Sequence, residues 1–283
     1  MKKIVVVFIT IFLLSSCNKE FNRAMKSADK TYILEVFEKE YEKKKWENVL
    51  TLSDHVKKLV AGTDDVKNLI YKTAYANYYD KNYRLAGNQF KNYALSYIND
   101  SLAESTLYLS AKCYYEGSLQ YNLDQVNTNL AIKEMQNFVD KYPNSAKVKD
   151  ANAVINELVV RNEKKAFENA KTLYNIGQYK ASSISFDNVI QDYPDTKFKE
   201  ELMVYILRSK TNLAKESVFE LKKERIIEAQ TAYRNFLQTF PDTSFKKEAE
   251  NLKSDLENEM VSVNEQTEKI QERIKNNKQK SST

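Results

Sequence analysis

Three nearly identical hexapeptides limit what this chain can fold into. They read DKYPNS at 140–145, QDYPDT at 191–196 and QTFPDT at 238–243, and they contain all the prolines of the chain. Proline cannot continue a helix and disfavours helix at the residue before it, whereas Ser or Thr two residues later is a favourable N-cap. Each hexapeptide therefore predicts the end of one helix and the start of the next. Their near-equal spacing predicts a repeated helical unit.

The composition favours helix along the whole chain. The 283 residues include only 4 glycines, whereas turn-rich β folds need many Gly and Pro residues. Apolar side chains make up 42% of the sequence, which is enough for a substantial core. The 19 tyrosines and 13 phenylalanines are then expected to pack mainly between helices.

A second pattern appears on counting back from the middle proline. Small and aromatic residues precede Pro194 in a fixed order: Ala170, Gly177, Tyr179, Ser182 and Phe186. This order resembles the tetratricopeptide repeat, a helix–turn–helix of about 34 residues with a small residue in its first helix, Gly near the turn, and Tyr, small and aromatic residues in its second helix. The small residues let the two helices approach closely, and the aromatic rings fill the remaining space.

The same pattern recurs elsewhere in the chain. The matching residues are Ala229 and Tyr233 before Pro241, Ala131 and Met135 before Pro143, Ala74, Tyr83, Ala86 and Phe90 in a copy without proline, and Trp46 with Val49 in the weakest copy. We predict an all-α fold, a tetratricopeptide-repeat α-solenoid of about five helix pairs with a C-terminal capping helix. The predicted pairs are 29–44 with 46–60, 65–80 with 83–98, 102–116 with 127–141, 146–175 with 179–192, and 197–215 with 220–239, and the long units reflect extensions such as 117–126.

The predicted plan of the chain has four parts. These are a lipoprotein signal peptide at 1–16, a lipidated tether at 17–28, five repeats over 29–243, and a C-terminal helix with a frayed tail over 244–283. Apolar residues recur at helical spacing in the last part, at Leu252, Leu256, Val263, Ile270 and Ile274. Its first half is expected to cap the terminal repeat. Beyond about residue 262 the segment is expected to fray or to form a helix that binds a partner.

The N-terminus has the features of a secretory signal. Two lysines precede an apolar run from Ile4 to Leu14, which is short for a membrane span. The following Leu-Ser-Ser-Cys resembles the bacterial lipobox, so Cys17 is expected to be lipidated and to anchor the chain in a membrane. The residue after it is Asn18, and a known sorting rule reserves Asp at that position for the inner membrane. We therefore expect the outer membrane, at its periplasmic face.

The sequence offers no constellation for catalysis. His55 is the single histidine and has no Ser or Cys at helical spacing, and there is no Gly-rich phosphate loop or pair of metal-spaced Cys or His residues. We expect no enzyme activity, no metal and no cofactor. The 44 basic and 39 acidic residues are spread along the chain, which argues against binding nucleic acid. Cys113 is expected to be buried within a helix, since no second cysteine can pair with it once Cys17 carries lipid.

A row of tyrosines is the strongest candidate for a binding surface. Tyr71, Tyr75 and Tyr78 lie at steps of four and three residues, which places them on one face of a predicted helix. They are candidates for a peptide groove because tyrosine contributes contact area and a polar tip. The alternative is that the rings pack between neighbouring repeats.

The lipobox, the degenerate repeats and the recurring F/Y-P-x-S/T breaks together resemble the BamD family of outer-membrane protein assembly lipoproteins, over about residues 1–245. The resemblance implies a non-catalytic periplasmic scaffold of the β-barrel assembly machinery. Its C-terminal repeats would bind a BamA-like barrel-assembly protein, with other assembly lipoproteins as further partners. Its N-terminal repeats would receive the aromatic-ended strands of unfolded outer-membrane proteins.

Three other functions remain as alternatives. The first is another periplasmic tetratricopeptide adaptor in cell-envelope or Tol–Pal coordination, although such proteins carry a soluble signal and an N-terminal coiled coil. The second is a nutrient-uptake lipoprotein, for which a Trp-rich pocket is expected, and this chain has one tryptophan. The third is an enzyme, for which His55 would need a nucleophile in its pocket.

Overall fold

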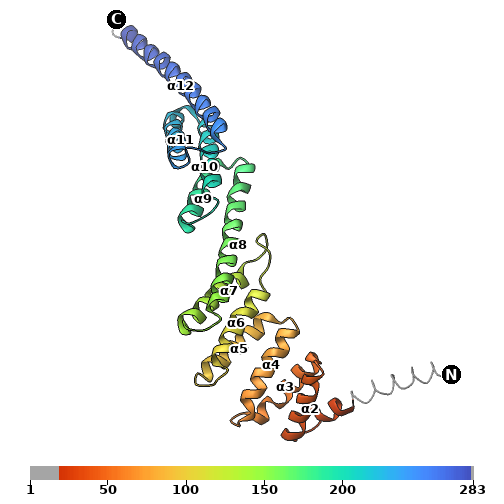
Figure 1. Ribbon diagram of the computed structural model, residues 1–283. Coiled ribbons are helices and arrows are strands. Elements are labelled where there is room, and N and C mark those ends of the chain that lie inside the picture. The colour runs from red at the N-terminus through yellow and green to blue at the C-terminus, as the bar shows by residue number, and fades with distance from the viewer. Residues whose placement is uncertain (1–18, 282–283) are drawn as a thin grey trace, which may run out of the picture. The chain divides into compact units, whose positions relative to one another are not determined.

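The computed structural model describes residues 19–281, and every regular element in that range is helical (Figure 1). The helices run over Lys30–Glu42 (α2), Trp46–Val60 (α3), Asp65–Tyr79 (α4), Tyr83–Ser96 (α5), Ala103–Glu116 (α6), Val126–Lys141 (α7), Val148–Asn175 (α8), Tyr179–Asp192 (α9), Lys199–Lys215 (α10), Phe219–Thr239 (α11) and Lys246–Ser281 (α12). They pack in consecutive pairs, as in a tetratricopeptide-like solenoid, so the predicted fold class is confirmed. The chain divides into two compact units, Met1–Val160 and Arg161–Thr283.

The first unit holds the pairs α2/α3, α4/α5 and α6/α7. Its cores form around fully buried rings, Phe37 in α2, Phe90 in α5 and Phe138 in α7. The small residues of the repeat pattern, such as Ala86 and Ala131, are also fully buried, as close approach of paired helices requires. The extension predicted before α7 is a non-helical link between α6 and α7.

The second unit holds α9, the pair α10/α11, and α12. Phe186 of α9 is fully buried and packs against Leu202 and Ile206 of α10. In the last repeat Phe236 is the fully buried ring of α11, while Tyr233, which the repeat pattern selects, is only partly buried. Tyr233 and Phe236 are three residues apart, less than one helical turn. Both rings therefore lie on the same side of α11 and pack in one hydrophobic cluster.

The turns inside three repeats share one backbone conformation. Lys44, Lys81 and Gly177 have φ angles of 56°, 65° and 77°, and each lies two residues before the second helix of its pair. The amide of the next residue bonds a carbonyl five residues earlier each time, for example Gln178 N to Leu173 O at 2.9 Å. This is the Schellman arrangement that ends a helix in the left-handed region.

The proline turns end and begin helices as predicted, but their hydroxyls do not cap the helices themselves. The N-cap of α10 is Phe198, which makes no side-chain cap. The Thr196 hydroxyl instead accepts a hydrogen bond from the Phe198 amide at 2.9 Å and closes a turn just before the helix. Thr243 holds the Phe245 amide in the same way at 3.1 Å. The prediction of an N-cap is therefore wrong by two residues.

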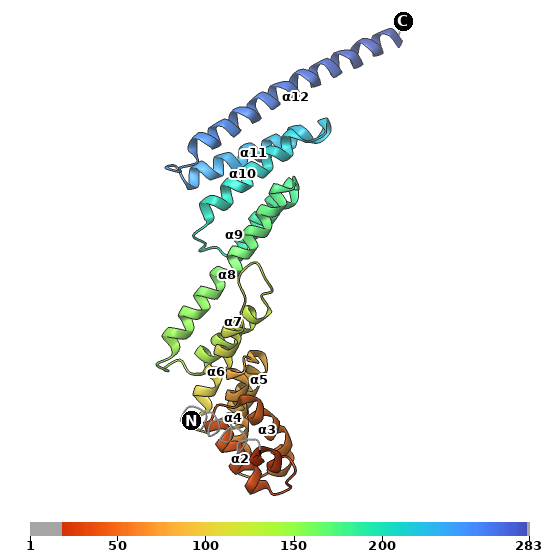
Figure 2. The same cartoon turned by 90° about the vertical axis from the view of Figure 1, so that its right-hand side faces the viewer.

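The long C-terminal helix α12 packs on its unit with its first half only. Leu256 and Val263 are buried against α10 and α11, whereas Ile270 and Ile274 are 44% and 51% exposed. The helix nevertheless continues to Ser281, and Figure 2 shows it running past the end of α11. The segment expected to fray is thus helical, with its apolar side chains in solvent.

The N-terminal end of the described chain is also ordered. Residues 19–24 are helical, Ala24 is fully buried, and Phe21 and Met25 pack against the core formed by α2 and α3. The predicted tether therefore includes a short helix that contacts the first repeat. The signal peptide and Cys17 lie outside the described residues.

Two further features concern cysteine and membrane insertion. Cys113 is buried inside α6, as predicted, and burial raises the pKa of its thiol to about 12.

Among residues 19–281 no helix combines the length and apolar character needed to cross a bilayer.

Candidate protein-binding surfaces

The three predicted tyrosines line one side of α4 and are partly buried. Tyr71 and Tyr75 make edge-on contacts with Phe90 of α5, with ring centroids 6.3 and 5.0 Å away. Tyr78 packs in the same cluster and contacts the Tyr83 ring at 5.7 Å. These rings fill the space between α4 and α5 and leave part of their surface in solvent.

A more exposed ring continues this row. Tyr79 is 51% exposed and stacks on Trp46 at 4.8 Å, with the ring planes 16° apart. It also stacks on Tyr75 at 6.1 Å, and Trp46 meets Tyr41 edge-on at 5.6 Å. Tyr79 is not among the residues predicted from the sequence, although its four-residue step from Tyr75 is the same helical signal.

The aromatic surface is defined as the continuous row of ring contacts that crosses the first two repeats. Its members are Tyr41, Trp46, Tyr71, Tyr75, Tyr79, Tyr93 and Tyr97. Burial raises the pKa of Tyr75 above its ordinary value and the pKa of Tyr41 and of Tyr93 to about 12. These three hydroxyls are neutral at physiological pH, and that of the buried Tyr93 already donates to the Asp100 carboxylate at 3.2 Å.

Charged groups border the aromatic surface. The Lys72 ammonium bonds the Glu38 carboxylate and lies over the Tyr41 ring, 5.2 Å from its centroid. Glu38 also helps line a cavity of about 480 Å³ between α2 and α4. The cavity is bordered by Leu34, Asn68 and Asp65 as well, so it offers apolar and polar contacts beside the rings.

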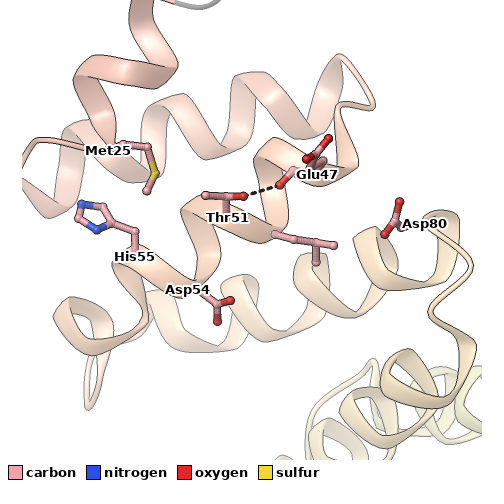
Figure 3. A pocket seen from close by; sticks show the side chains of 7 residues that line it. Met25, Glu47, Thr51, Asp54, His55 and Asp80 are labelled. Atoms are coloured by element: carbon pink, nitrogen blue, oxygen red, sulfur yellow. Dashed lines mark hydrogen bonds between the residues drawn. The ribbon is translucent and has the colours of Figure 1, made fainter.

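His55 lies in a different pocket, of about 700 Å³, shown in Figure 3. Its Nε2 is 3.0 Å from the Ser27 carbonyl oxygen. The hydroxyl in the lining belongs to Thr51 and donates to the Glu47 carbonyl at 2.9 Å, as the dashed line in Figure 3 marks. His55 thus contacts the segment before α2, and no Ser or Cys is present among the lining residues. No group of three metal-ligating side chains is found within residues 19–281.

Comparison with known proteins gives the family. The family model described as "YfiO: Outer membrane lipoprotein" matches residues 27–216, well over half of the chain. The chain belongs to this family of outer membrane lipoproteins. The YfiO match confirms the resemblance drawn from the sequence, and it spans α2 to α10, including the aromatic surface. The helices α11 and α12 lie beyond it.

Two individual proteins complete the comparison. Outer membrane protein assembly factor BamD from Caulobacter vibrioides is 29% identical over 119 residues, which are 40% of this chain and 39% of that protein. The YfiO-family chain thus spans about two fifths of the length of this curated relative. A solved structure titled "Computational Design of Self-Assembling Cyclic Protein Homooligomers" covers 95% of this chain and 99% of its own at 10% identity. Its TM-score of 0.24 is too low to support any structural argument.

Proposed function

We propose that this YfiO-family lipoprotein is a non-catalytic scaffold in the assembly of outer-membrane β-barrel proteins. The Caulobacter relative, an outer membrane protein assembly factor, supports this role, as do the repeats and the lipobox. A lipid on Cys17 would hold the chain at the periplasmic face of the outer membrane.

The observation that carries the proposal is the aromatic surface of the first two repeats. Tyr79 and Trp46 present stacked rings at this surface, and the cavity beside Leu34 lies next to charged groups that fix orientation. The N-terminal repeats receive the aromatic-ended strand of an unfolded barrel protein there. Aromatic pairs contribute about 0.5–1.5 kcal/mol beyond the buried area, so a few rings give weak, reversible binding.

The C-terminal repeats bind a BamA-like barrel-assembly protein, alongside other assembly lipoproteins. Holding the client strand and the assembly protein on one anchored chain raises their effective concentration, so neither contact has to be tight.

Affinity purification of the full chain from outer membranes tests the proposal. The expected result is recovery of a β-barrel protein with several periplasmic domains, together with Cys17 in lipidated form by mass spectrometry. A Cys17→Ser variant should leave the membrane fraction, whereas Cys113→Ser, which changes the buried cysteine, should stay. Recovery of only peptidoglycan synthases or Tol components would instead favour the periplasmic adaptor.

A further inference from the structure

A groove crosses the second unit on the side where α9 and α11, the second helices of their pairs, lie. It lies between α9 and α11, with α10 as its floor, and Figure 2 shows α10 between these two helices. Its volume is about 430 Å³, within the range of small-molecule ligand sites. Ile190, Met203, Ile206 and Ala232 form its apolar base. It belongs to different helices from the aromatic surface.

The two ends of the groove differ in charge. Asp187 of α9, Lys210 of α10 and Glu228 of α11 line it near one end, giving two carboxylates against one ammonium. Lys199 stands at the first turn of α10, at the other end, near Thr239. One end is therefore acidic and the other basic.

Asp187 is the most informative of these groups. It is partly buried, and no hydrogen bond joins its carboxylate to another residue within the described range 19–281. Burial raises the pKa of Asp187, and the nearby Lys210 ammonium partly offsets this effect. A partly buried carboxylate without a hydrogen-bond donor is costly, so a bound cationic group would stabilise it.

The dimensions of the groove suit an extended segment. Lys199 and Lys210 are three turns apart on α10, which at 1.5 Å per residue is about 16 Å. An extended chain covers that length with about five residues at 3.3 Å each. Asn235 and Gln238 place side-chain amides along the α11 wall, where they can pair with the backbone of an extended segment. A helical partner would not need them, because its backbone bonds are already made internally.

We propose that this groove binds an extended segment of a partner polypeptide that carries a basic side chain at the Asp187 end, apolar side chains over Met203, and a carboxylate at the Lys199 end. The proposal deepens the proposed function, since it gives the C-terminal repeats a specific docking site and a type of sequence that fits it. The bound segment can run in either direction along the groove, because the two charges that position it are on side chains.

Fluorescence anisotropy with synthetic peptides tests this groove, with the full chain in detergent. The probes are Arg-Val-Phe-Val-Glu in a Gly-Ser frame and two controls whose ends are both Glu or both Arg. The mixed-charge peptide should bind about ten-fold more tightly than either control, a factor equivalent to 1.4 kcal/mol. Equal affinity for the three peptides, or no binding, would overturn the proposal.

Charge reversal at one residue provides a sharper test. Asp187→Lys should change the preference from the mixed peptide to the doubly acidic one, because both ends of the groove then carry an ammonium. Asp192→Lys is the matched control, since Asp192 is an exposed carboxylate on α9 outside the groove, and it should leave the order of affinities unchanged. Should Asp187→Lys fail to fold, Asp187→Asn should reduce the affinity for the mixed peptide while circular dichroism stays that of the parent chain.

The remaining outcomes separate the groove from the scaffold role. One outcome of sedimentation experiments is a dimer that is lost in Asp187→Lys, while no peptide binds. That result would assign the groove to a second copy of the chain and overturn the proposal. Recovery of the barrel-assembly protein without peptide binding would reject the groove and leave the scaffold role standing. Peptide binding with the expected preference, without that recovery, would support the groove and reject the scaffold role.

Discussion

The Thr196 hydroxyl donates a hydrogen bond to the Glu163 carboxylate, which ties a proline turn to the helix one repeat earlier. Glu163 is only 5% exposed. The next proline turn makes the same link, from Thr243 to Glu200 at 2.5 Å. The recurring hydroxyl of these turns therefore both orders the turn and donates to a carboxylate on the first helix of the preceding repeat.

Removing this donor should destabilise the second unit. Thr196→Ala leaves the buried Glu163 carboxylate without it and also removes the acceptor for the Phe198 amide. The free energy of unfolding should fall by about 1–3 kcal/mol, the cost of an unsatisfied buried polar group. Urea denaturation of the full chain measures this change. Thr196→Ser keeps the hydroxyl and should stay close to the parent, so equal losses in both variants would contradict the assigned role.

At the junction between α5 and α6, which has no proline, the turn supplies the carboxylate and the preceding helices supply the donors. The stability of the chain should therefore depend on pH. Asp100 lies in the turn before α6 and accepts from Lys67, from the Leu102 amide at 2.9 Å and from Tyr93 at 3.2 Å. The Lys67 hydrogen bond, more than the others, lowers the pKa of Asp100 below 3.8. Because the folded pKa is the lower one, this stabilisation is present above pH 3.8 and is lost as the pH falls through the folded value.

The thermal midpoint of the parent chain should therefore fall as the pH drops below 3.8, and more steeply than that of Asp100→Asn. Asp64→Asn is the matched control, because Asp64 is an exposed carboxylate of the same unit with no side-chain cap on α4. It should follow the parent curve. Parallel curves for the parent and Asp100→Asn would show that the Asp100 contacts do not contribute to stability.

The two halves of α12 should differ in their contribution to stability. Leu256 is fully buried against the α10 and α11 core, whereas Ile270 lies on the same helix with 44% exposure. Leu256→Ala should cost about 2–5 kcal/mol because it leaves a cavity. Ile270→Ala should change stability by less than about 0.5 kcal/mol, as for other exposed sites. Chemical denaturation of both variants measures the difference, and a comparable loss at Ile270 would mean that the distal half is also packed.

The sequence predicts where the helices begin and end better than it predicts the backbone conformation and long-range contacts of the turns. Gly177 could be assigned to its turn because glycine is the residue that adopts a left-handed backbone without strain. Lys44 and Lys81 adopt the same conformation, and nothing in a lysine indicates it. Likewise the proline of residues 191–196 marks a helix break locally, whereas the pairing with Glu163 joins residues 33 apart and depends on the packed repeat.

The candidate site was predicted only in part, for a similar reason. The four- and three-residue steps place Tyr71, Tyr75 and Tyr78 on one face of α4, and the structure agrees. Which ring reaches solvent depends on neighbouring helices, since Tyr79 stays 51% exposed although it stacks on Trp46 of α3 and on Tyr75. Periodicity gives the face of a helix but not what lies opposite it.

Tyr79 should contribute to peptide binding more than to stability. Tyr79→Ser removes a half-exposed ring that the peptide can contact. Binding of a fluorescent peptide ending in Tyr-Phe should therefore weaken several-fold, in line with about 0.5–1.5 kcal/mol for one aromatic pair between peptide and chain. Leu95→Ser, at a side chain 55% exposed on α5 and outside the aromatic surface, is the control and should bind normally. Unchanged affinity in Tyr79→Ser with a normal circular dichroism spectrum would remove Tyr79 from the proposed site.

The shared turn conformation gives a last prediction that depends on the backbone alone. Gly177 has a φ of 77° and no atom within 4 Å of the position that a Cβ would occupy, so Gly177→Ala meets no steric clash with neighbours. The left-handed backbone still costs a side-chain-bearing residue about 1–2 kcal/mol. The lower entropy of alanine in the unfolded chain offsets part of this cost, so stability should fall by about 0.5–1 kcal/mol. At the equivalent Lys81, with a φ of 65°, the change to Gly relieves the same strain. Glycine also gains entropy in the unfolded chain, so Lys81→Gly should raise the free energy of unfolding by only about 0.5–1 kcal/mol. Urea denaturation of the two variants should therefore give shifts of opposite sign, and shifts of the same sign would show that the turns are not equivalent.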